Sequence, residues 1–134
     1  VCSTTEGDER RTIDAIMTRL RSIVEETGAG LILVSHLRRI DGNKGHENGI
    51  QVNLSHLRGS QSIAQLSDTV IALERNQQAE DIEEANTTVL RVLKSRYTGD
   101  VGYATSLLYD RDTGRLHELQ REPFEKESGD LQWI

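Results

Sequence analysis

Apolar positions near the start of the chain repeat with the period of an α-helix. Between residues 8 and 27 they fall on one face of such a helix. Gly28 follows directly, and glycine often ends a helix because it adopts a left-handed backbone conformation without strain. The pattern predicts a helix over residues 8–27, and its apolar face consists of Ile13, Ile16, Met17, Leu20, Ile23 and Val24.

Two short runs further along the chain are apolar without interruption. Residues 31–34 read Leu-Ile-Leu-Val, and residues 70–73 read Val-Ile-Ala-Leu. Continuous apolar runs of this length are typical of strands that are covered on both faces of a parallel sheet. A helix, a glycine turn and an apolar strand also form a unit of α/β proteins. The sequence therefore predicts an α/β fold with a mainly parallel sheet.

The stretch between the two runs is largely polar. Residues 38–53 contain several Gly and Asn residues and almost no periodicity, which predicts a long loop. A loop of this length in a compact domain is usually functional or disordered. We favour function because this loop leaves directly from the polar end of the first predicted strand. Residues 61–67 predict a short helix with Ile63 and Leu66 on one face.

The second half of the chain predicts strands separated by polar turns. Residues 76–86 read as a polar, acidic surface loop, and residues 87–97 read as a strand. Lys94 and Arg96 are two positions apart at the end of that strand, so both point to one face. Residues 103–109 and 115–119 predict a hairpin.

The last residues differ in character from the rest. From residue 121 onwards the chain is acidic and ends in Leu131-Gln132-Trp133-Ile134. An apolar end on an acidic tail fits a docking peptide, and it fits a disordered terminus equally well.

Composition narrows the class of protein. A length of 134 residues suits one domain, and a net charge of −6 argues against a generally basic nucleic-acid surface. A local basic loop remains compatible with that charge.

The single Cys2 cannot form an internal disulfide, which favours a reducing cytosol. No apolar run is long enough to cross a bilayer, and no signal peptide is recognised. The chain begins with Val1, from which we expect a piece of a longer protein.

Four motifs occur in a fixed order. They are Ser35-His36-Leu37-Arg38, LRGS at 57–60, QLSDTVIALERNQQ at 65–78 and LKSRYTGDVG at 93–102. Together they resemble the C-terminal part of DnaB-like hexameric replicative DNA helicases, in particular the helicase half of phage primase-helicases. The resemblance covers nearly the whole chain before the acidic tail. It implies a RecA-like core with a mainly parallel sheet and a C-terminal antiparallel hairpin. Residues 1–120 would then be a partial helicase domain without its phosphate-loop part, and residues 121–134 an acidic flexible tail.

The resemblance also implies roles at a nucleotide site. His36 matches the sensor of the terminal phosphate, where a neutral imidazole at a strand tip can hydrogen-bond to phosphate. Arg96 matches the arginine finger that reaches into the neighbouring subunit, and Lys94 would assist it. Arg75 and Tyr109 match the pair that stacks on the nucleotide base, and Gln65 matches a nucleotide-binding glutamine. The alternative for His36 is a structural histidine. The alternative for Arg96 is an exposed basic residue at a strand end, and that for Tyr109 is a half-buried tyrosine of the sheet.

Residues 38–47 match the main DNA-contacting loop of the family. Arg38, Arg39, Lys44, Gly45 and His46 would contact DNA there, and the alternative is a surface loop with incidental charges. The coupling residues between this loop and the nucleotide site would be Arg58 and Gly59. The sequence departs from the family at three places. Gly42 stands where a Lys is expected, Ala64 where phage relatives offer a basic residue, and His56 where an acid is usual.

Two expected motifs do not occur in the sequence. There is no G-x-x-x-x-G-K-[ST] loop and no apolar strand ending in the Asp that would hold Mg²⁺. The resemblance implies that the parent protein uses ATP or dTTP with Mg²⁺, and that this chain alone is inactive. It further implies three partners: single-stranded DNA, a homo-oligomeric ring (a hexamer), and a DNA polymerase at the acidic tail. The expected location is the cytoplasm of a bacterial or phage-infected cell. The alternatives are a RecA-like recombinase or other ring ATPase, and a non-catalytic interaction fragment.

Overall fold

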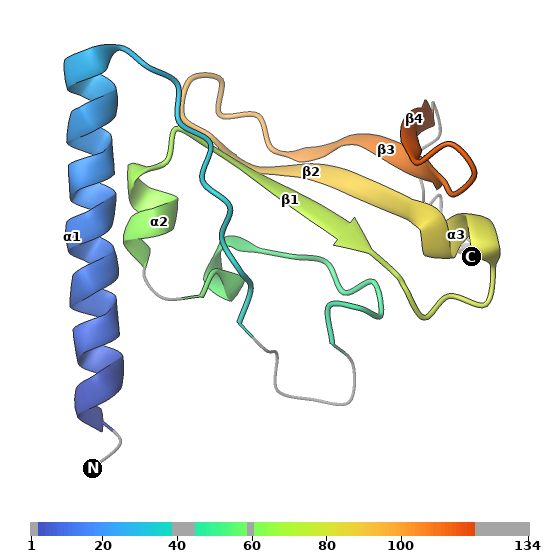
Figure 1. The fold of residues 1–134 in the computed structure, drawn as a ribbon, viewed down its shortest axis with the longest axis horizontal. Helices are drawn as coiled ribbons and strands as arrows, with labels where there is room; N and C mark the ends of the chain where they lie inside the picture. Colours follow the sequence, from blue (N-terminus) through green and yellow to red (C-terminus); the bar gives the residue numbers. More distant parts are fainter. Residues whose placement is uncertain (1–2, 39–44, 59–60, 120–134) are drawn as a thin grey trace, which may run out of the picture.

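The computed structural model describes residues 3–38, 45–58 and 61–119, with side chains from residue 7 onwards. A long helix lies beside one end of a four-stranded sheet, and short helices lie around the sheet (Figure 1). The predicted tail, residues 121–134, and much of the predicted DNA loop lie outside the described residues.

The first helix, α1, spans Ser3–Thr27 and confirms the prediction from periodicity, although it begins earlier than predicted. Gly28 ends it with φ +66°, and its N–H donates to the Val24 carbonyl at 2.9 Å. Met17 is buried, but Ile16 remains 51% exposed and Ile23 39% exposed. The apolar face of α1 is therefore only partly covered by the described residues.

The sheet consists of β1 (Thr69–Arg75), β2 (Thr87–Ser95), β3 (Gly102–Asp110) and β4 (Arg115–Leu119), in that spatial order. All three neighbouring pairs are antiparallel. The predicted parallel arrangement is therefore wrong for the described strands, whereas the predicted C-terminal hairpin is confirmed. The connections between these strands are too short for the crossover that a parallel pair requires, so consecutive strands turn back on one another.

β1 carries the second apolar run and lies at one edge of the sheet. Ala72 and Glu74 are buried on one face of β1, while Ile71 is 54% exposed and Leu73 64% exposed on the other. The prediction that this strand is covered on both faces is wrong for the described structure. Side chains alternate between the two faces of a strand, and here the described residues cover only one of them.

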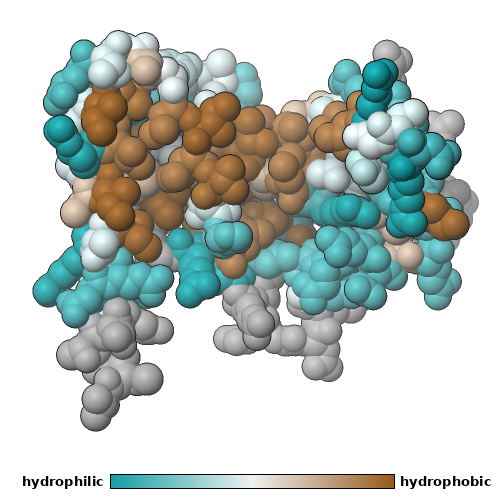
Figure 2. Space-filling model, viewed as in Figure 1, coloured by the Kyte–Doolittle hydropathy of each residue, from teal (hydrophilic) through white to brown (hydrophobic). Residues whose placement is uncertain are grey.

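The first apolar run, residues 31–34, forms no strand in the structure, which contradicts the prediction. Leu31, Ile32, Leu33 and Val34 are between 46% and 94% exposed. The run passes near α2 (Gln61–Leu66) and β1 on its way from α1 (Figure 1). No described strand forms a hydrogen-bonded ladder with it, so the run stays irregular. It contributes to the broad apolar area on this face of the molecule (Figure 2).

The predicted acidic loop at 76–86 is partly wrong, because its end forms the helix α3, Ile82–Asn86. The Asp81 carboxylate accepts a hydrogen bond from the Glu84 N–H at 2.8 Å and caps the first turn. The predicted helix over residues 61–67 is confirmed as α2, in which Ile63 is buried. A short 3₁₀ helix, η1 (Leu54–His56), precedes it and is capped by Asn53.

The buried apolar core of the described residues is small and aliphatic, and it consists of Met17, Val52, Ile63, Ala72 and Val89. Gly114 has φ +68° in the turn between β3 and β4, a conformation that other residues adopt only with strain. No helix among the described residues is both long and apolar enough to cross a membrane.

Candidate functional site

The base of the predicted DNA loop is closed by hydrogen bonds. Leu37 and Leu57 form an antiparallel bridge. On either side of it, the Arg38 N–H donates to the His56 carbonyl at 2.9 Å, and the Arg58 N–H donates to the His36 carbonyl at 3.0 Å. The structure thus brings together the predicted sensor His36, the predicted DNA contact Arg38 and the predicted coupling residue Arg58. All three side chains are exposed.

Two histidine side chains, those of His46 and His56, contact each other beside this bridge. The rings of His46 and His56 lie edge to face with centroids 5.2 Å apart. The His46 Nε2 atom is 3.3 Å from the Arg38 carbonyl oxygen, which ties the far side of the loop to its base. Partial burial lowers the pKa of His56, and the nearby His46 and Arg38 lower it further. Arg39, Lys44 and Gly59, also predicted as site residues, lie outside the described part of the chain.

A second set of contacts joins the loop to the sheet. The Gln77 N–H donates to the Glu47 carbonyl at 2.9 Å, beside a bridge between Asn48 and Asn76. The Val52 N–H donates to the buried carboxylate of Glu74 at 2.7 Å. Glu74 is not among the site residues predicted from the sequence.

Glu74 is held from the sheet as well. Its side chain is 7% exposed, and its Oε2 atom lies 3.3 Å from Arg91 Nε on the neighbouring strand. A buried carboxylate is costly unless it is paired and hydrogen-bonded. Here one carboxylate satisfies both Arg91 and the backbone of the loop, so it fixes the loop on the sheet.

Arg96, the predicted arginine finger, and Lys94 both donate hydrogen bonds to the end of α2. Lys94 Nζ donates to the carbonyls of Ala64 at 2.6 Å and Gln65 at 3.1 Å. Arg96 Nη2 donates to the Gln65 carbonyl at 2.9 Å. The last carbonyls of a helix lack partners within the helix and attract cations. The two basic side chains therefore approach one target, as their spacing predicted, and Gln65 takes part through its backbone.

Asp68 completes this cluster, although no role is predicted for it from the sequence. Its carboxylate forms an ion pair with Arg96 Nη1 at 2.9 Å and accepts a hydrogen bond from Arg21 Nη1 at 2.7 Å. Glu25 also accepts from Arg21, and these two acids raise the pKa of its guanidinium. No pattern along the chain relates positions 21, 68 and 96, so only the fold could find this cluster.

The predicted base-stacking pair lies at the opposite end of the sheet from α2. Arg75 faces Thr88 across β1 and β2, and Thr88 faces Leu107 across β2 and β3. Tyr109 is two residues beyond Leu107, so register puts Arg75 and Tyr109 on the same face with β2 between them. Tyr109 is 39% exposed.

Arg75 itself is bound to α3. Its Nε atom donates to the Ala85 carbonyl at 2.6 Å and its Nη2 atom to Asn86 Oδ1 at 3.4 Å. Arg111, from the turn after β3, also donates to Asn86 Oδ1, at 3.2 Å. The short helix α3 therefore positions the Arg75 guanidinium, and Asn86 is a further residue that the sequence did not reveal.

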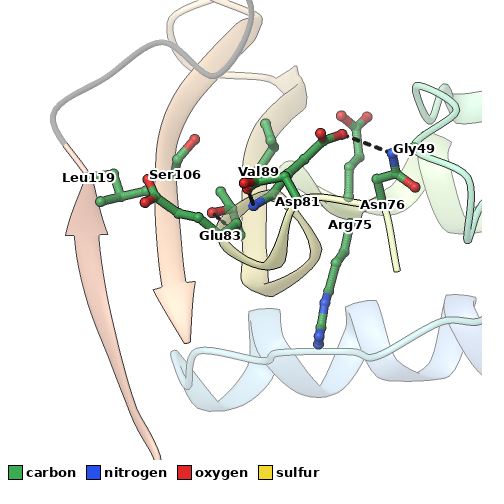
Figure 3. A pocket seen from close by; sticks show the side chains of 11 residues that line it. Gly49, Arg75, Asn76, Asp81, Glu83, Val89, Ser106 and Leu119 are labelled. Atoms are coloured by element: carbon green, nitrogen blue, oxygen red, sulfur yellow. Dashed lines mark hydrogen bonds between the residues drawn. The ribbon is translucent and has the colours of Figure 1, made fainter. Parts of the chain in front are cut away.

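A pocket of about 270 Å³ opens beside this end of the sheet. Ser106 and Leu119 lie on one side of it, and Gly49 and Asn76 on the other (Figure 3). The Asn76 amide donates to Glu84 Oε1 at 2.8 Å and joins the loop to α3. Among the described residues, no group of three or more His, Cys, Asp or Glu side chains is placed to hold a metal ion.

Comparison with known proteins decides the family. The sequence profile of the DnaB-like helicase C-terminal domain matches residues 2–118. The chain belongs to the DnaB-like helicase C-terminal domain family. This family has a RecA-like α/β core, and the antiparallel sheet described above is the part of that core that can be placed here.

Nearly the whole length of this chain is similar to part of a phage protein. The chain is 43% identical over 133 residues to the DNA helicase/primase of Enterobacteria phage T3. The match covers 99% of this chain and 23% of that relative, so the chain spans about a quarter of the relative's length. The predicted resemblance to DnaB-like helicases is confirmed. The roles of individual site residues, the division at residue 120 and the function of the acidic tail stay predictions.

Proposed function

We propose that this chain is the part of a replicative DNA helicase that grips single-stranded DNA and reports the nucleotide state of the neighbouring subunit. Family membership and the likeness to a phage DNA helicase/primase support the general activity. The observation that carries the detailed proposal is that two nearby parts of the chain contact the two predicted sites. Residues 56–58 are hydrogen-bonded to His36 and Arg38, and Gln65 of α2 accepts a hydrogen bond from Arg96.

In this mechanism His36 lies where the terminal phosphate is sensed, and its backbone is hydrogen-bonded to Arg58. A shift of His36 would move Arg38, which follows it in the DNA loop, and would pull on the segment that leads to α2. Basic side chains and backbone amides of the loop hold the phosphates of one strand without reading its sequence. Movement of this loop along the strand is the translocation step.

Arg96 acts in the neighbouring subunit. An arginine finger stabilises charge on the transferred phosphoryl group and can contribute about 10³–10⁵ in rate. Because the finger belongs to one subunit and the phosphate loop to the next, hydrolysis requires a ring of subunits. ATP or dTTP with Mg²⁺ supplies the phosphoanhydride, and Arg75 with Tyr109 contacts the base. Lys94 holds the end of α2 in place beside the finger.

The test uses the full-length protein that contains this chain. Arg96→Ala should lower the kcat of DNA-stimulated hydrolysis by about 10³, because the charge that stabilises the transferred group is removed. Binding to single-stranded DNA should be retained, and unwinding should be lost. The matched control is Arg19→Ala, which removes an exposed arginine whose ion pair with Glu26 spans 3.8 Å.

Mixed rings give the decisive result. Subunits with Arg96→Ala, mixed with subunits that lack a functional phosphate loop, should restore hydrolysis at those interfaces where an intact finger meets an intact loop. Full activity of the Arg96→Ala protein would refute the finger. Strand exchange in place of unwinding by the unmodified protein would favour the recombinase alternative.

A further inference from the structure

We propose that Asp68 is a positioning residue for the Arg96 finger: it holds the guanidinium in the orientation in which it meets the neighbour's phosphate. This inference rests on the proposed role of Arg96. It adds a residue that no motif of the chain singles out for that role, and its test separates the failure of one from the failure of the other.

Arg96 is fixed to Asp68 at two levels. Its backbone N–H donates to the Asp68 carbonyl at 2.8 Å, and its Nη1 atom lies 2.9 Å from Asp68 Oδ1. The guanidinium is restrained again on its Nη2 side by the Gln65 carbonyl at 2.9 Å. A long arginine side chain loses considerable rotamer freedom when it is ordered, and these contacts impose that order before any nucleotide arrives.

The contacts leave the guanidinium able to bind. A guanidinium carries five N–H donors in a planar fork, and Asp68 and Gln65 approach it through the two Nη atoms. Neither of these contacts uses the Nε–H. The Arg96 side chain is 42% exposed, whereas that of Asp68 is 30% exposed. The Arg96 side chain, although held by Asp68, is therefore more exposed than its partner and is accessible to an anion from another subunit.

The charges around Asp68 allow it to orient the Arg96 guanidinium without neutralising the positive charge of the cluster. Asp68 faces two arginines, because its Oδ2 atom accepts from Arg21 while its Oδ1 atom pairs with Arg96. Lys94 adds a further positive charge at the same end of α2. Glu25 also pairs with Arg21, so two carboxylates stand among three cations and the cluster keeps a net positive charge, which preserves the attraction of the finger for phosphate.

The experiment compares ligands that do and do not require the finger, in the full-length ring. ADP with aluminium fluoride mimics the transferred phosphoryl group, whereas ADP alone does not. Asp68→Asn should weaken binding of ADP–aluminium fluoride about tenfold, the size of a coupling between contacting residues. It should leave the affinity for ADP and ring assembly unchanged. In an Arg96→Ala background, Asp68→Asn should have no further effect.

Two controls complete the design. Glu26→Gln removes another acid, on α1, and should change neither affinity. Arg21→Gln breaks the link from Asp68 to α1 but leaves the Arg96 pair, so it should retain transition-state-mimic binding. This second variant also decides the matter if Asp68→Asn rings fail to assemble. Weakening by Arg21→Gln as large as that expected for Asp68→Asn would mean that Asp68 only joins α1 to the sheet.

The outcomes separate the two proposals. If Arg96→Ala weakens binding of the mimic and Asp68→Asn does not, Asp68 has no positioning role and the finger stands. If Arg96→Ala itself leaves the mimic's affinity unchanged, the proposed function of Arg96 fails, and the role of Asp68 fails with it. Equal weakening of ADP and the mimic by Asp68→Asn would contradict positioning and indicate a general structural effect.

Discussion

His56 shows how neighbouring groups change the pKa of a single residue at the base of the predicted DNA loop. Its ring is packed against His46, and Arg38 lies close enough to disfavour a second positive charge. Its pKa is therefore lowered from the ordinary value of 6.5, with partial burial as the largest cause. The unfolded loop binds a proton more readily than the folded loop, so stability rises with pH across this range.

We expect the loop base to loosen as the pH falls below about 6.5. Above that pH, His56 is neutral in both the folded and the unfolded loop, and no stability is lost. Below the lowered pKa of the folded loop, the loss of stability is complete. Hydrogen-exchange protection over residues 45–58 in the full-length protein, corrected for intrinsic exchange, measures it. His56→Gln should flatten the decline, since glutamine keeps an acceptor and cannot be charged. His117→Gln, on β4, should leave the decline in place, and an unchanged decline in His56→Gln would contradict the assignment.

Among the elements, the loop and the sheet are joined by Glu74 more than by apolar packing. Only Val52 of the loop segment 45–53 is buried, and its N–H is bonded to the Glu74 carboxylate. Arg91 holds the same carboxylate from β2. The orientation of the loop therefore depends on this hydrogen-bonded ion pair together with the Gln77–Glu47 hydrogen bond and the Asn48–Asn76 bridge.

Glu74→Ala should destabilise this junction by about 1–3 kcal/mol, because it leaves the Val52 N–H and Arg91 unsatisfied. Glu74→Gln should cost less, since its amide oxygen can still accept from Val52. The exchange rate of the Val52 amide in the full-length protein reports the difference directly. Equal exchange in the alanine and glutamine variants would show that this acceptor does not hold the loop.

The same elements show what the sequence could and could not predict. Periodicity predicts α1, and turn residues predict the β3–β4 hairpin, because both signals are local. The apolar run at 70–73 predicts a strand but not the direction of its neighbour, which is set by the short connection to β2 and not by the run itself. The helix α3 escaped notice in a polar stretch, although Asp81 followed by Glu84 is a helix-capping pattern.

Residues of the candidate site could be predicted only where the resemblance assigns a role to a position in one of the four motifs. His36, Arg58 and Arg96 were found by resemblance, and the structure brings the first two together. Asp68 lies in the third motif, but the resemblance assigned it no role, and Asn86 lies outside all four motifs. Their partners, Arg21 with Arg96 and Arg75 with Arg111, lie many residues away and meet only after folding.

At the scale of the molecule, an apolar hollow of about 850 Å³ runs between residues 31–34 and β1. The apolar face of α1 lines it together with Ile32, Val34, Ile71 and Leu73, side chains that are more than half exposed. Figure 2 shows the apolar area on this face. An exposed apolar surface beside an edge strand favours association of chains with one another.

The chain produced alone should therefore self-associate in a concentration-dependent way. Replacing both Ile32 and Val34 by Lys should reduce this association, because charges on an exposed apolar segment oppose contact between chains. Sedimentation velocity over a range of protein concentrations measures the change. Ile82→Lys, at an exposed apolar site on α3, serves as a control and should reduce association less. Association that is insensitive to the double replacement would place the contact elsewhere.

The bridge between Leu37 and Leu57 has a consequence for how freely the DNA loop can vary. Once its base is closed, residues added to the loop cost mainly the entropy of closing a longer segment. That entropy changes with the logarithm of length, so doubling the loop costs only about 0.6 kcal/mol. Residues can therefore be added where the contacts of His46, Glu47 and Val52 are kept. The length of this loop is thus open to evolutionary change, and to the insertion of a reporter peptide, while His36 and Arg58 stay in place.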